Sequence, residues 1–197
     1  MLQIPMNPVR CAAILAGGLS TRMGRDKALL EIEGEPLVRR TARTLESLFE
    51  RTIVVTNREE VADAAQLSAI SDIHFNKGPL AGIEAALSHF AEATFIVACD
   101  LPYLHTEFIQ FQCQRWSQEL DALVPQSNNG LETLHAIWAP SCLPRVRESL
   151  EPERPPSLRR VLSQLNVQII TVEEARHFDT QLRCFENWNT PEDVAGV

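Results

Sequence analysis

The chain alternates short, continuous apolar runs with stretches in which apolar residues recur at helical spacing. The continuous runs predict buried strands, and the helical stretches predict amphipathic helices that pack on them. The expected strands are residues 11–16, 52–56, 69–71, 94–99, 122–124, 134–138 and 167–172. The expected helices are residues 36–49, a short helix from 59, and 80–90, 109–120, 143–150 and 158–165.

This alternation predicts an α/β fold with a mostly parallel central sheet covered by helices on both faces. The length of 197 residues fits a single domain spanning 1–197. Residues 151–156 are rich in proline and charge, and we expect a linker or mobile loop there, inside the domain. Ligands of open α/β sheets bind beyond the carboxyl ends of the strands, so the loops after Ala16 and from Asp100 are the places to examine.

Charge and cysteine content narrow the class of protein. The formal net charge of -8 and the pI of about 5.2 argue against general nucleic-acid binding, although a local basic cluster can still bind an anion. The five cysteines are scattered and show neither zinc-site nor disulfide spacing. Because we also find no signal peptide and no membrane-length apolar run, we expect a cytoplasmic protein without membrane contact.

The loop after the first expected strand, residues 15–27, combines glycine with positive charge. Gly17, Gly18 and Gly24 allow a tight turn whose backbone N–H groups can approach phosphate oxygens. The loop also supplies three cations, which are Arg22, Arg25 and Lys27. This combination favours binding of a nucleoside triphosphate, whereas the alternative is a surface turn with solvated charges.

Two familiar phosphate loops do not fit residues 15–27. A Walker A loop ends in Gly-Lys-Ser/Thr, whereas Gly24 is followed here by Arg25-Asp26. The dinucleotide fingerprint G-x-G-x-x-G is not matched by Gly17-Gly18 followed by Gly24. ATPase and dehydrogenase chemistry are therefore not expected.

Asp100 follows the strongest apolar run, residues 94–99, and precedes Leu101-Pro102. A carboxylate at the end of a central strand is held rigidly and faces the ligand crevice. Mg²⁺ prefers such oxygen ligands and bridges from them to substrate phosphates. We therefore expect Asp100 to bind Mg²⁺, the alternative being a turn or helix cap.

Taken together, these motifs resemble the molybdenum cofactor nucleotidyltransferases over nearly the whole chain. The matching segments are Leu15-Ala16-Gly17-Gly18, Arg22-Met23-Gly24, Asp26-Lys27, Gly78-Pro79-Leu80-Ala81-Gly82, Cys99-Asp100-Leu101-Pro102, Leu134-His135-Ala136 and residues 187–193. Two short segments resemble those of the guanylyltransferases more than those of the cytidylyl relatives. The sequence has Ala16-Gly17-Gly18 where cytidylyl relatives tend to have Ala-Ala-Gly, and Cys99-Asp100-Leu101-Pro102 where they tend to have Asp-Gln-Pro.

The resemblance implies a Rossmann-like three-layer nucleotidyltransferase fold that transfers GMP from MgGTP to molybdopterin. It implies a nucleotide site formed by Leu15, Ala16, Gly17, Gly18, Lys27, Asn57, Asp72, Gly78, Pro79, Gly82 and Asp100. Lys27, Arg22 and Asp100 would act in catalysis, Asp100 as the Mg²⁺ ligand, and Asn187 and Asn189 would lie on the molybdopterin side. It also implies transient contacts with molybdoenzymes or other cofactor-biosynthesis proteins.

Several alternatives stay open on the sequence. The same chemistry with CTP would give the cytosine dinucleotide, and a sugar or polyol phosphate could replace molybdopterin. A non-catalytic nucleotide-binding module for molybdoenzymes is the alternative from another class. No two histidines show the spacing of a helical metal pair, and His135 could face either the ligand or the core.

Overall fold

A central sheet forms along the apolar runs that the sequence predicts as strands. The computed structural model describes residues 8–17, 27–72, 74 and 77–188. The strands are β1 (Cys11–Leu15), β2 (Glu31–Ile32), β3 (Glu35–Pro36), β4 (Arg51–Val55), β5 (Ser68–Ile70), β6 (Thr94–Ala98), β7 (Ala122–Ser127), β8 (Gly130–Leu131), β9 (His135–Trp138) and β10 (Val167–Ile170). All seven expected strands are present.

The main sheet has the strand order β10-β7-β9-β6-β1-β4-β5, with β8 paired to β7. β1 lies in the interior of the sheet and pairs in parallel with β4 and β6, and β4 pairs in parallel with β5. β9 is antiparallel to both of its neighbours, β6 and β7. The prediction of an α/β fold with a mostly parallel sheet is confirmed.

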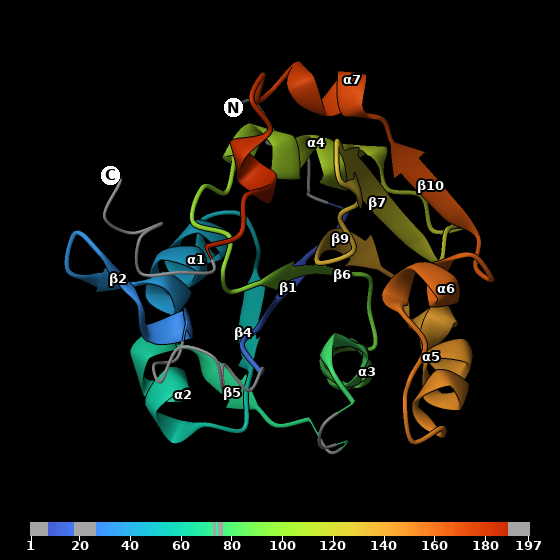
Figure 1. The fold of residues 1–197 in the computed structure, drawn as a ribbon, viewed down its shortest axis with the longest axis horizontal. Helices are drawn as coiled ribbons and strands as arrows, with labels where there is room; N and C mark the ends of the chain where they lie inside the picture. Colours follow the sequence, from blue (N-terminus) through green and yellow to red (C-terminus); the bar gives the residue numbers. More distant parts are fainter. Residues whose placement is uncertain (1–7, 18–26, 73, 75–76, 189–197) are drawn as a thin grey trace, which may run out of the picture.

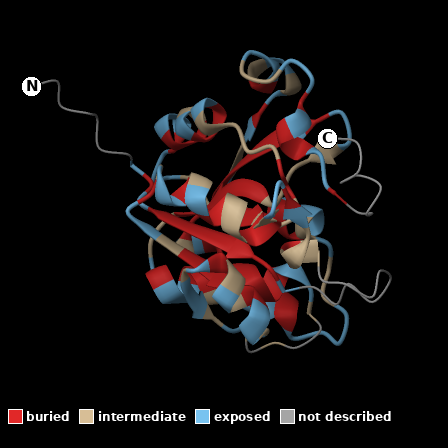
Figure 2. Ribbon diagram, turned by 90° about the vertical axis from the view of Figure 1, so that its left-hand side faces the viewer, coloured by how far each residue is buried: buried red, intermediate tan, exposed pale blue. Residues whose placement is uncertain are grey.

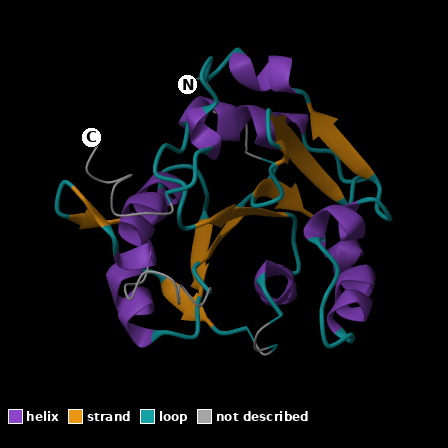
Figure 3. Ribbon diagram, viewed as in Figure 1, coloured by secondary structure: helices purple, strands orange, loops and turns teal. Residues whose placement is uncertain are grey.

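Helices cover both faces of this sheet (Figures 1 and 3). One face carries α3, α5 and α6, and the other carries α1, α2, α4 and α7. The helices are α1 (Leu37–Glu46), α2 (Glu59–Ala65), α3 (Pro79–Phe90), α4 (Thr106–Arg115), α5 (Leu143–Leu150), α6 (Leu158–Leu162) and α7 (Val172–Arg176). Three short 3₁₀ turns are η1 (Lys27–Leu29), η2 (Pro140–Cys142) and η3 (Arg183–Phe185).

The strands are apolar on both sides because each side packs on a helical layer. In β1, Ala12 and Ile14 contact the cluster under α1 and α4, whereas Cys11, Ala13 and Leu15 contact the cluster under α3. All five side chains of β1 are buried, and buried residues make up most of the central strands in Figure 2. A continuous apolar run without alternation is the pattern expected of such a doubly covered strand.

Several predicted elements extend too far. The helices expected over 36–49 and 158–165 end at Glu46 and Leu162. Two other elements end early for a clear local reason. The helix expected over 109–120 ends at Arg115, and Trp116 has an extended backbone and closes the core instead of continuing the helix. The strand expected over 167–172 ends at Ile170 because Thr171 caps α7. The Thr171 side chain accepts a hydrogen bond from the backbone of Glu174, and the Glu174 carboxylate accepts one from the backbone of Thr171, which forms a capping box.

The sequence analysis also missed the small elements. β2 and β3 form a hairpin whose turn places Glu33 and Gly34 at positive φ, and β8 is a two-residue strand. Strands this short have no hydrophobic period to detect.

The proline-rich segment 151–156 lies between α5 and α6 and is largely exposed. The Lys77 ammonium group donates hydrogen bonds to the carbonyl oxygens of Pro152, at 2.5 Å, and Glu153, at 3.3 Å. The segment is therefore held near the residue that precedes α3.

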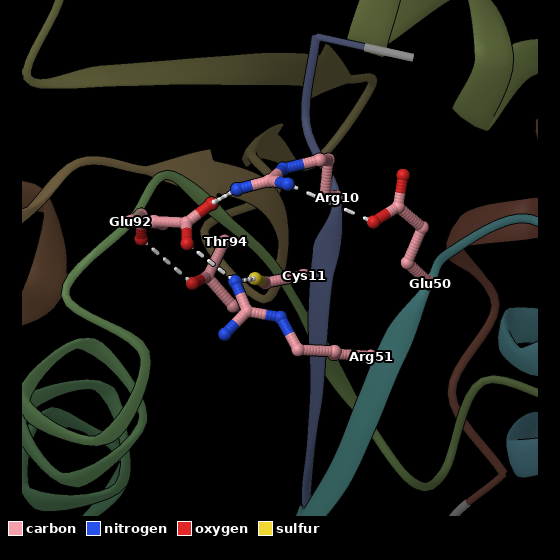
Figure 4. Close-up of polar contacts among 6 residues, drawn as sticks. All are labelled: Arg10, Cys11, Glu50, Arg51, Glu92 and Thr94. Carbon is pink, nitrogen blue, oxygen red and sulfur yellow. Dashed lines mark hydrogen bonds and ion pairs between the residues drawn. The ribbon is translucent and has the colours of Figure 1, made fainter. Parts of the chain in front are cut away.

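An ion-pair network joins the starts of three neighbouring strands, β1, β4 and β6, at the amino edge of the sheet (Figure 4). Glu92, in the turn before β6, accepts hydrogen bonds from Arg10 at 2.7 Å and from Arg51 at 2.5 Å. The two arginines lower the pKa of Glu92. Because these side chains are exposed, water and salt screen the network. It lies at the edge opposite to the carboxyl ends of the parallel strands.

The described residues contain no helix that is both long enough and apolar enough to cross a membrane. All five cysteines carry free thiols, and burial raises the pKa of Cys11 and Cys142.

His135 belongs to the core. It is fully buried in β9, with ring centroids of Phe95, Phe108 and Phe185 at 5.2, 5.6 and 5.3 Å. Burial lowers the pKa of His135 from 6.5 to about 4, so the imidazole is neutral in the folded protein near neutral pH. Of the two placements that the sequence left open, the structure shows the core.

This burial predicts loss of stability in acid. Below pH 6.5 the unfolded chain protonates His135, whereas the folded chain resists until about pH 4. The free energy of unfolding should therefore fall by about 3 kcal/mol in total as the pH is lowered from 6.5 to about 4. Urea unfolding at pH 7 and pH 4.5 measures the loss. Leucine is close to histidine in size and cannot protonate, so His135→Leu should show a shallower acid slope. Equal slopes in both proteins would contradict the prediction.

Candidate nucleotide and metal site

The predicted site residues that the structure describes gather at the carboxyl edge of the parallel strands. Chain segments leave this edge after β1, β4, β5 and β6. In order, the segments contain Ala16-Gly17, Asn57, Asp72 and Asp100. The parallel register places these strand ends side by side, which is the usual ligand position of an open α/β sheet.

The backbone after β1 is held on two sides. The Ala16 N–H donates to the Val55 carbonyl oxygen at 3.0 Å, and the Cys99 N–H donates to the Leu15 carbonyl oxygen at 3.2 Å. The Ala16 carbonyl oxygen accepts from the Arg58 guanidinium at 2.8 Å. The start of the glycine loop is therefore fixed by the strands on either side of β1.

Arg58 is a site residue that sequence reasoning missed. It follows Asn57 at the end of β4, and its guanidinium reaches back to the backbone of the first loop. The only signal in the sequence is a single cation after a strand, which also describes many solvated arginines. The contact depends on the pairing of β4 with β1, which becomes visible only in the structure.

Asp72 is brought to the first loop. A Cβ atom placed on Gly17 would lie 3.5 Å from the Asp72 carboxylate oxygen Oδ2. Gly17 is exposed, and Asn57, at the end of the intervening strand β4, is exposed as well. The structure therefore gathers Gly17, Asn57 and Asp72 along one stretch of the edge.

Lys27 and Asp100 form the charged pair of the site. The Lys27 ammonium nitrogen lies 3.8 Å from the Asp100 carboxylate, and the two side chains are 26% and 23% exposed. Burial raises the pKa of Asp100, and the positive charge of Lys27 partly opposes that rise. The carboxylate is thus a partly desolvated anion beside the Lys27 cation, and its burial favours binding of additional positive charge.

The segment that begins α3 packs on the end of β1. Gly78 has φ of +68°, a conformation that favours glycine, and Pro79 occupies the first turn of the helix. Gly82 is buried, and a Cβ atom there would lie 3.0 Å from the Leu15 side chain. Gly78 and Pro79 are exposed, whereas the role of Gly82 in this structure is close packing.

This contact predicts a graded response at Gly82. Gly82→Val should force Leu15 to move and should lower the free energy of unfolding by about 1–3 kcal/mol. Gly82→Ala adds one carbon and improves helix propensity by about 1 kcal/mol, so its effect should be smaller. Urea unfolding of both variants tests this order. A fully stable valine variant would show that the space is not limiting.

The last described residues lie next to Asp100. The Trp188 N–H donates to the Asp100 carbonyl oxygen at 3.0 Å, and the Trp188 residue is 4% exposed. Asn187, which precedes it, is exposed. Asn187 is therefore placed near the strand end that carries Asp100, while Gly18, Arg22 and Asn189 lie outside the described residues.

The site has the donor chemistry of a magnesium–nucleotide site. Among the described residues there is no cluster of three or more potential metal-ligating side chains. Mg²⁺ does not require such a cluster, because it keeps several waters and is held by one or two carboxylates together with substrate phosphates. The partly buried Asp100 fits this requirement.

Comparison with known proteins agrees with this geometry. The family model described as MobA-like NTP transferase domain matches residues 12–169. A probable molybdenum cofactor guanylyltransferase of Peptoclostridium acidaminophilum is 36% identical, with 93% of this chain and 86% of the relative covered. The molybdenum cofactor guanylyltransferase of Syntrophotalea carbinolica is 32% identical, with 92% and 87% covered.

A solved structure shares the fold. The crystal structure of molybdopterin-guanine dinucleotide biosynthesis protein A from Archaeoglobus fulgidus superposes with a TM-score of 0.78 at 29% identity, covering 94% of this chain and 95% of that one. The fold and these relatives thus define a nucleotidyltransferase. More particularly, the chain belongs to the family of MobA-like NTP transferase domains.

Proposed function

We propose that this enzyme transfers GMP from MgGTP to molybdopterin, forming the guanine dinucleotide form of the cofactor and releasing pyrophosphate. The observation that carries the proposal is the Lys27–Asp100 pair at the carboxyl edge of the sheet, beside the start of the glycine loop. The names of the similar proteins support the choice of both substrates.

The nucleotide would lie along the edge from β1 to β5. The Ala16 N–H is already donated to the Val55 carbonyl oxygen, so the backbone of Leu15 and Ala16 would border the phosphates and fix the start of the loop. Gly17, continued by Gly18, would offer N–H groups to phosphate oxygens, as glycine-rich loops after a first strand do. Asn57 and Asp72 would contact the nucleoside, since both follow strands next to β1. On the other side of β1, Gly78 and Pro79 expose the backbone that precedes α3, while Gly82 lets α3 approach Leu15.

Asp100 is the residue that would hold Mg²⁺, together with phosphate oxygens of the nucleotide. Its raised pKa and its position beside Lys27 mean that a second cation would relieve a desolvated negative charge. When bound, Mg²⁺ supplies Lewis-acid stabilisation of the charge on the phosphates.

The reaction is a displacement at the α-phosphorus of GTP. An oxygen of the molybdopterin phosphate forms the new bond, the bond from the α-phosphorus to the bridging oxygen breaks, and pyrophosphate leaves with the electron pair. A phosphate monoester has its second pKa at about 6, so the nucleophile is already ionised near neutral pH. A general base is unnecessary, and the chain contributes by positioning and charge stabilisation.

Two cations would offset the repulsion between the phosphates of the two substrates. Lys27 is held beside Asp100, and Arg22 lies in the same loop of the sequence. Their charges would be most valuable in the transition state, where the leaving pyrophosphate gains negative charge. Molybdopterin would bind on the opposite side of Asp100, near Asn187 and Asn189, because Trp188 ties this segment to the Asp100 backbone.

Thermal unfolding with GTP, CTP, ATP and UTP, each with and without Mg²⁺, tests the nucleotide part. A ligand at one hundred times its Kd should add about 2.7 kcal/mol of stability. A shift specific to GTP that depends on Mg²⁺ is expected. A CTP-specific shift would change the product to the cytosine dinucleotide, and no shift with any nucleotide would contradict the proposal.

Product formation tests the transfer itself. Incubation with MgGTP and molybdopterin should release pyrophosphate and give the guanine dinucleotide. Nucleotide binding without turnover on molybdopterin would favour another phosphate acceptor or the non-catalytic binding module.

A further inference from the structure

Trp188 packs beside the segments that follow Lys27 and Asp100 in the sequence. Its residue is 4% exposed, and it forms a small apolar cluster with Ile32 and Leu37, against which Leu30 and Tyr103 also pack. The cluster is separate from the two large cores on the faces of the sheet. Its members come from the turn after Lys27, the start of α1 and the loop after Asp100.

The first link from Trp188 leads to Asp100. The Trp188 backbone N–H donates to the Asp100 carbonyl oxygen at 3.0 Å, and the indole meets the ring of Tyr103 edge-on, with centroids 5.8 Å apart. The Arg183 guanidinium lies 4.0 Å above the same Tyr103 ring. The loop from Asp100 to Tyr103 is therefore held at both ends by the segment 183–188.

The second link leads to Lys27. The Leu30 N–H donates to the Lys27 carbonyl oxygen at 3.1 Å, and the Leu37 N–H donates to the Leu30 carbonyl oxygen at 2.8 Å. Leu30 thus connects the Lys27 turn to the start of α1, and Trp188 belongs to the apolar cluster that contains Ile32 and Leu37 and against which Leu30 packs. A shift of the indole would move the turn that carries Lys27.

The Lys27–Asp100 distance of 3.8 Å is longer than a charge-assisted hydrogen bond. A direct hydrogen bond between the two side chains therefore does not set their spacing, which depends on the segments that carry them. Trp188 contacts both segments, one by a backbone hydrogen bond and the other by side-chain packing.

We propose that Trp188 is a positioning residue that sets the spacing of Lys27 and Asp100, and thereby the affinity of the site for Mg²⁺ with nucleotide. This inference rests on the proposed function, since it assigns those roles to Lys27 and Asp100. It also gives the Asn187–Trp188 segment a second role besides contact with molybdopterin. A movement of this segment would change the distance between Lys27 and Asp100.

Trp188→Ala and Trp188→Phe test the proposal, with Trp116→Ala as a matched control. Trp116 is 9% exposed and packs in the core under α4 instead of the Trp188 cluster. The first readout is amide hydrogen exchange of the metal-free, nucleotide-free protein over residues 27–32 and 99–104. The second is the Mg²⁺ concentration that gives half-maximal activity with GTP and molybdopterin, measured well below each unfolding temperature.

Trp188→Ala should speed exchange in both segments and raise the half-maximal Mg²⁺ concentration, each by about tenfold or more, the range seen when support of a metal ligand is lost. Trp188→Phe should restore most of the wild-type exchange rate and Mg²⁺ dependence. If the alanine variant does not fold, the same two measurements on Trp188→Phe test the proposal. Trp116→Ala should lower the unfolding temperature without either change.

Exchange that stays within about twofold of the wild type in Trp188→Ala would overturn the proposal, because support of the pair is expected to matter about tenfold. Equal effects of Trp116→Ala would also overturn it, by showing general loss of packing. Failure of the proposed function is distinguishable, since the wild-type protein would then lack turnover while the exchange result still reports on the positions of Lys27 and Asp100.

Discussion

Replacing Lys27 with alanine is expected to lower kcat/KM for MgGTP by about 30- to 1000-fold, or roughly 2–4 kcal/mol of transition-state stabilisation. The ammonium group is held beside Asp100, at the edge where the phosphates are proposed to bind. Its charge should count most when pyrophosphate leaves, so kcat and kcat/KM should fall together. Steady-state kinetics with GTP and molybdopterin, measuring pyrophosphate release, gives both constants.

Two further variants test whether the effect depends on the Lys27 side chain itself or only on the net charge of the protein. Lys27→Arg keeps the positive charge but changes its shape, so partial activity is expected. Arg145→Ala removes a cation that is paired with Glu148 on α5, outside the site, and should retain normal kinetics. Near-normal kcat/KM in Lys27→Ala would show that another group neutralises the phosphates.

Asp100→Asn should separate activity from stability. Loss of the carboxylate removes the proposed metal ligand, so activity should fall by about 100-fold or more and the Mg²⁺-dependent part of the nucleotide shift should disappear. The metal-free protein, in contrast, should unfold at a higher temperature than the wild type. The folded state raises the pKa of Asp100, which means that it favours the neutral carboxyl, and asparagine is neutral at every pH.

The stability gain in Asp100→Asn should vary with pH. It should be present near neutral pH, where the wild-type carboxylate is charged, and should vanish in acid as Asp100 becomes protonated. Glu132 offers a matched control, because burial also raises its pKa and it is not a predicted site residue. Glu132→Gln should leave Mg²⁺ dependence unchanged. A destabilised Asp100→Asn protein would contradict the conclusion that burial disfavours the charged Asp100 carboxylate.

The layered fold could be predicted because the interior strands of the main sheet are buried on both faces. Such strands appear as unbroken apolar runs, as in β1 and β6, and the helices between them show a periodic apolar face. The ends of elements were less predictable, since they depend on local hydrogen bonds such as the Thr171–Glu174 capping box. The reversed direction of β9 leaves no trace in composition, because a strand buried on both faces has the same pattern in either direction.

The position of a candidate residue was predictable where it lies just after a strand. Asp100, Asn57 and Asp72 all lie at the expected edge of the sheet. The contact of Arg58 with the first loop and the contact of Trp188 with Asp100 join residues far apart in the sequence. Such contacts depend on strand order and on the path of the last described segment, and neither is encoded in a local motif.

The antiparallel insertion of β9 has a consequence for incomplete chains. β6 pairs with β1 on one side and with β9 on the other, although β9 comes later in the sequence than β7. A chain that stops before His135 would leave one side of the apolar segment Thr94–Ala98 as an unpaired edge. Exposed apolar edges recruit strands from other molecules. Fragments and stalled chains that end between β6 and β9 are therefore expected to aggregate.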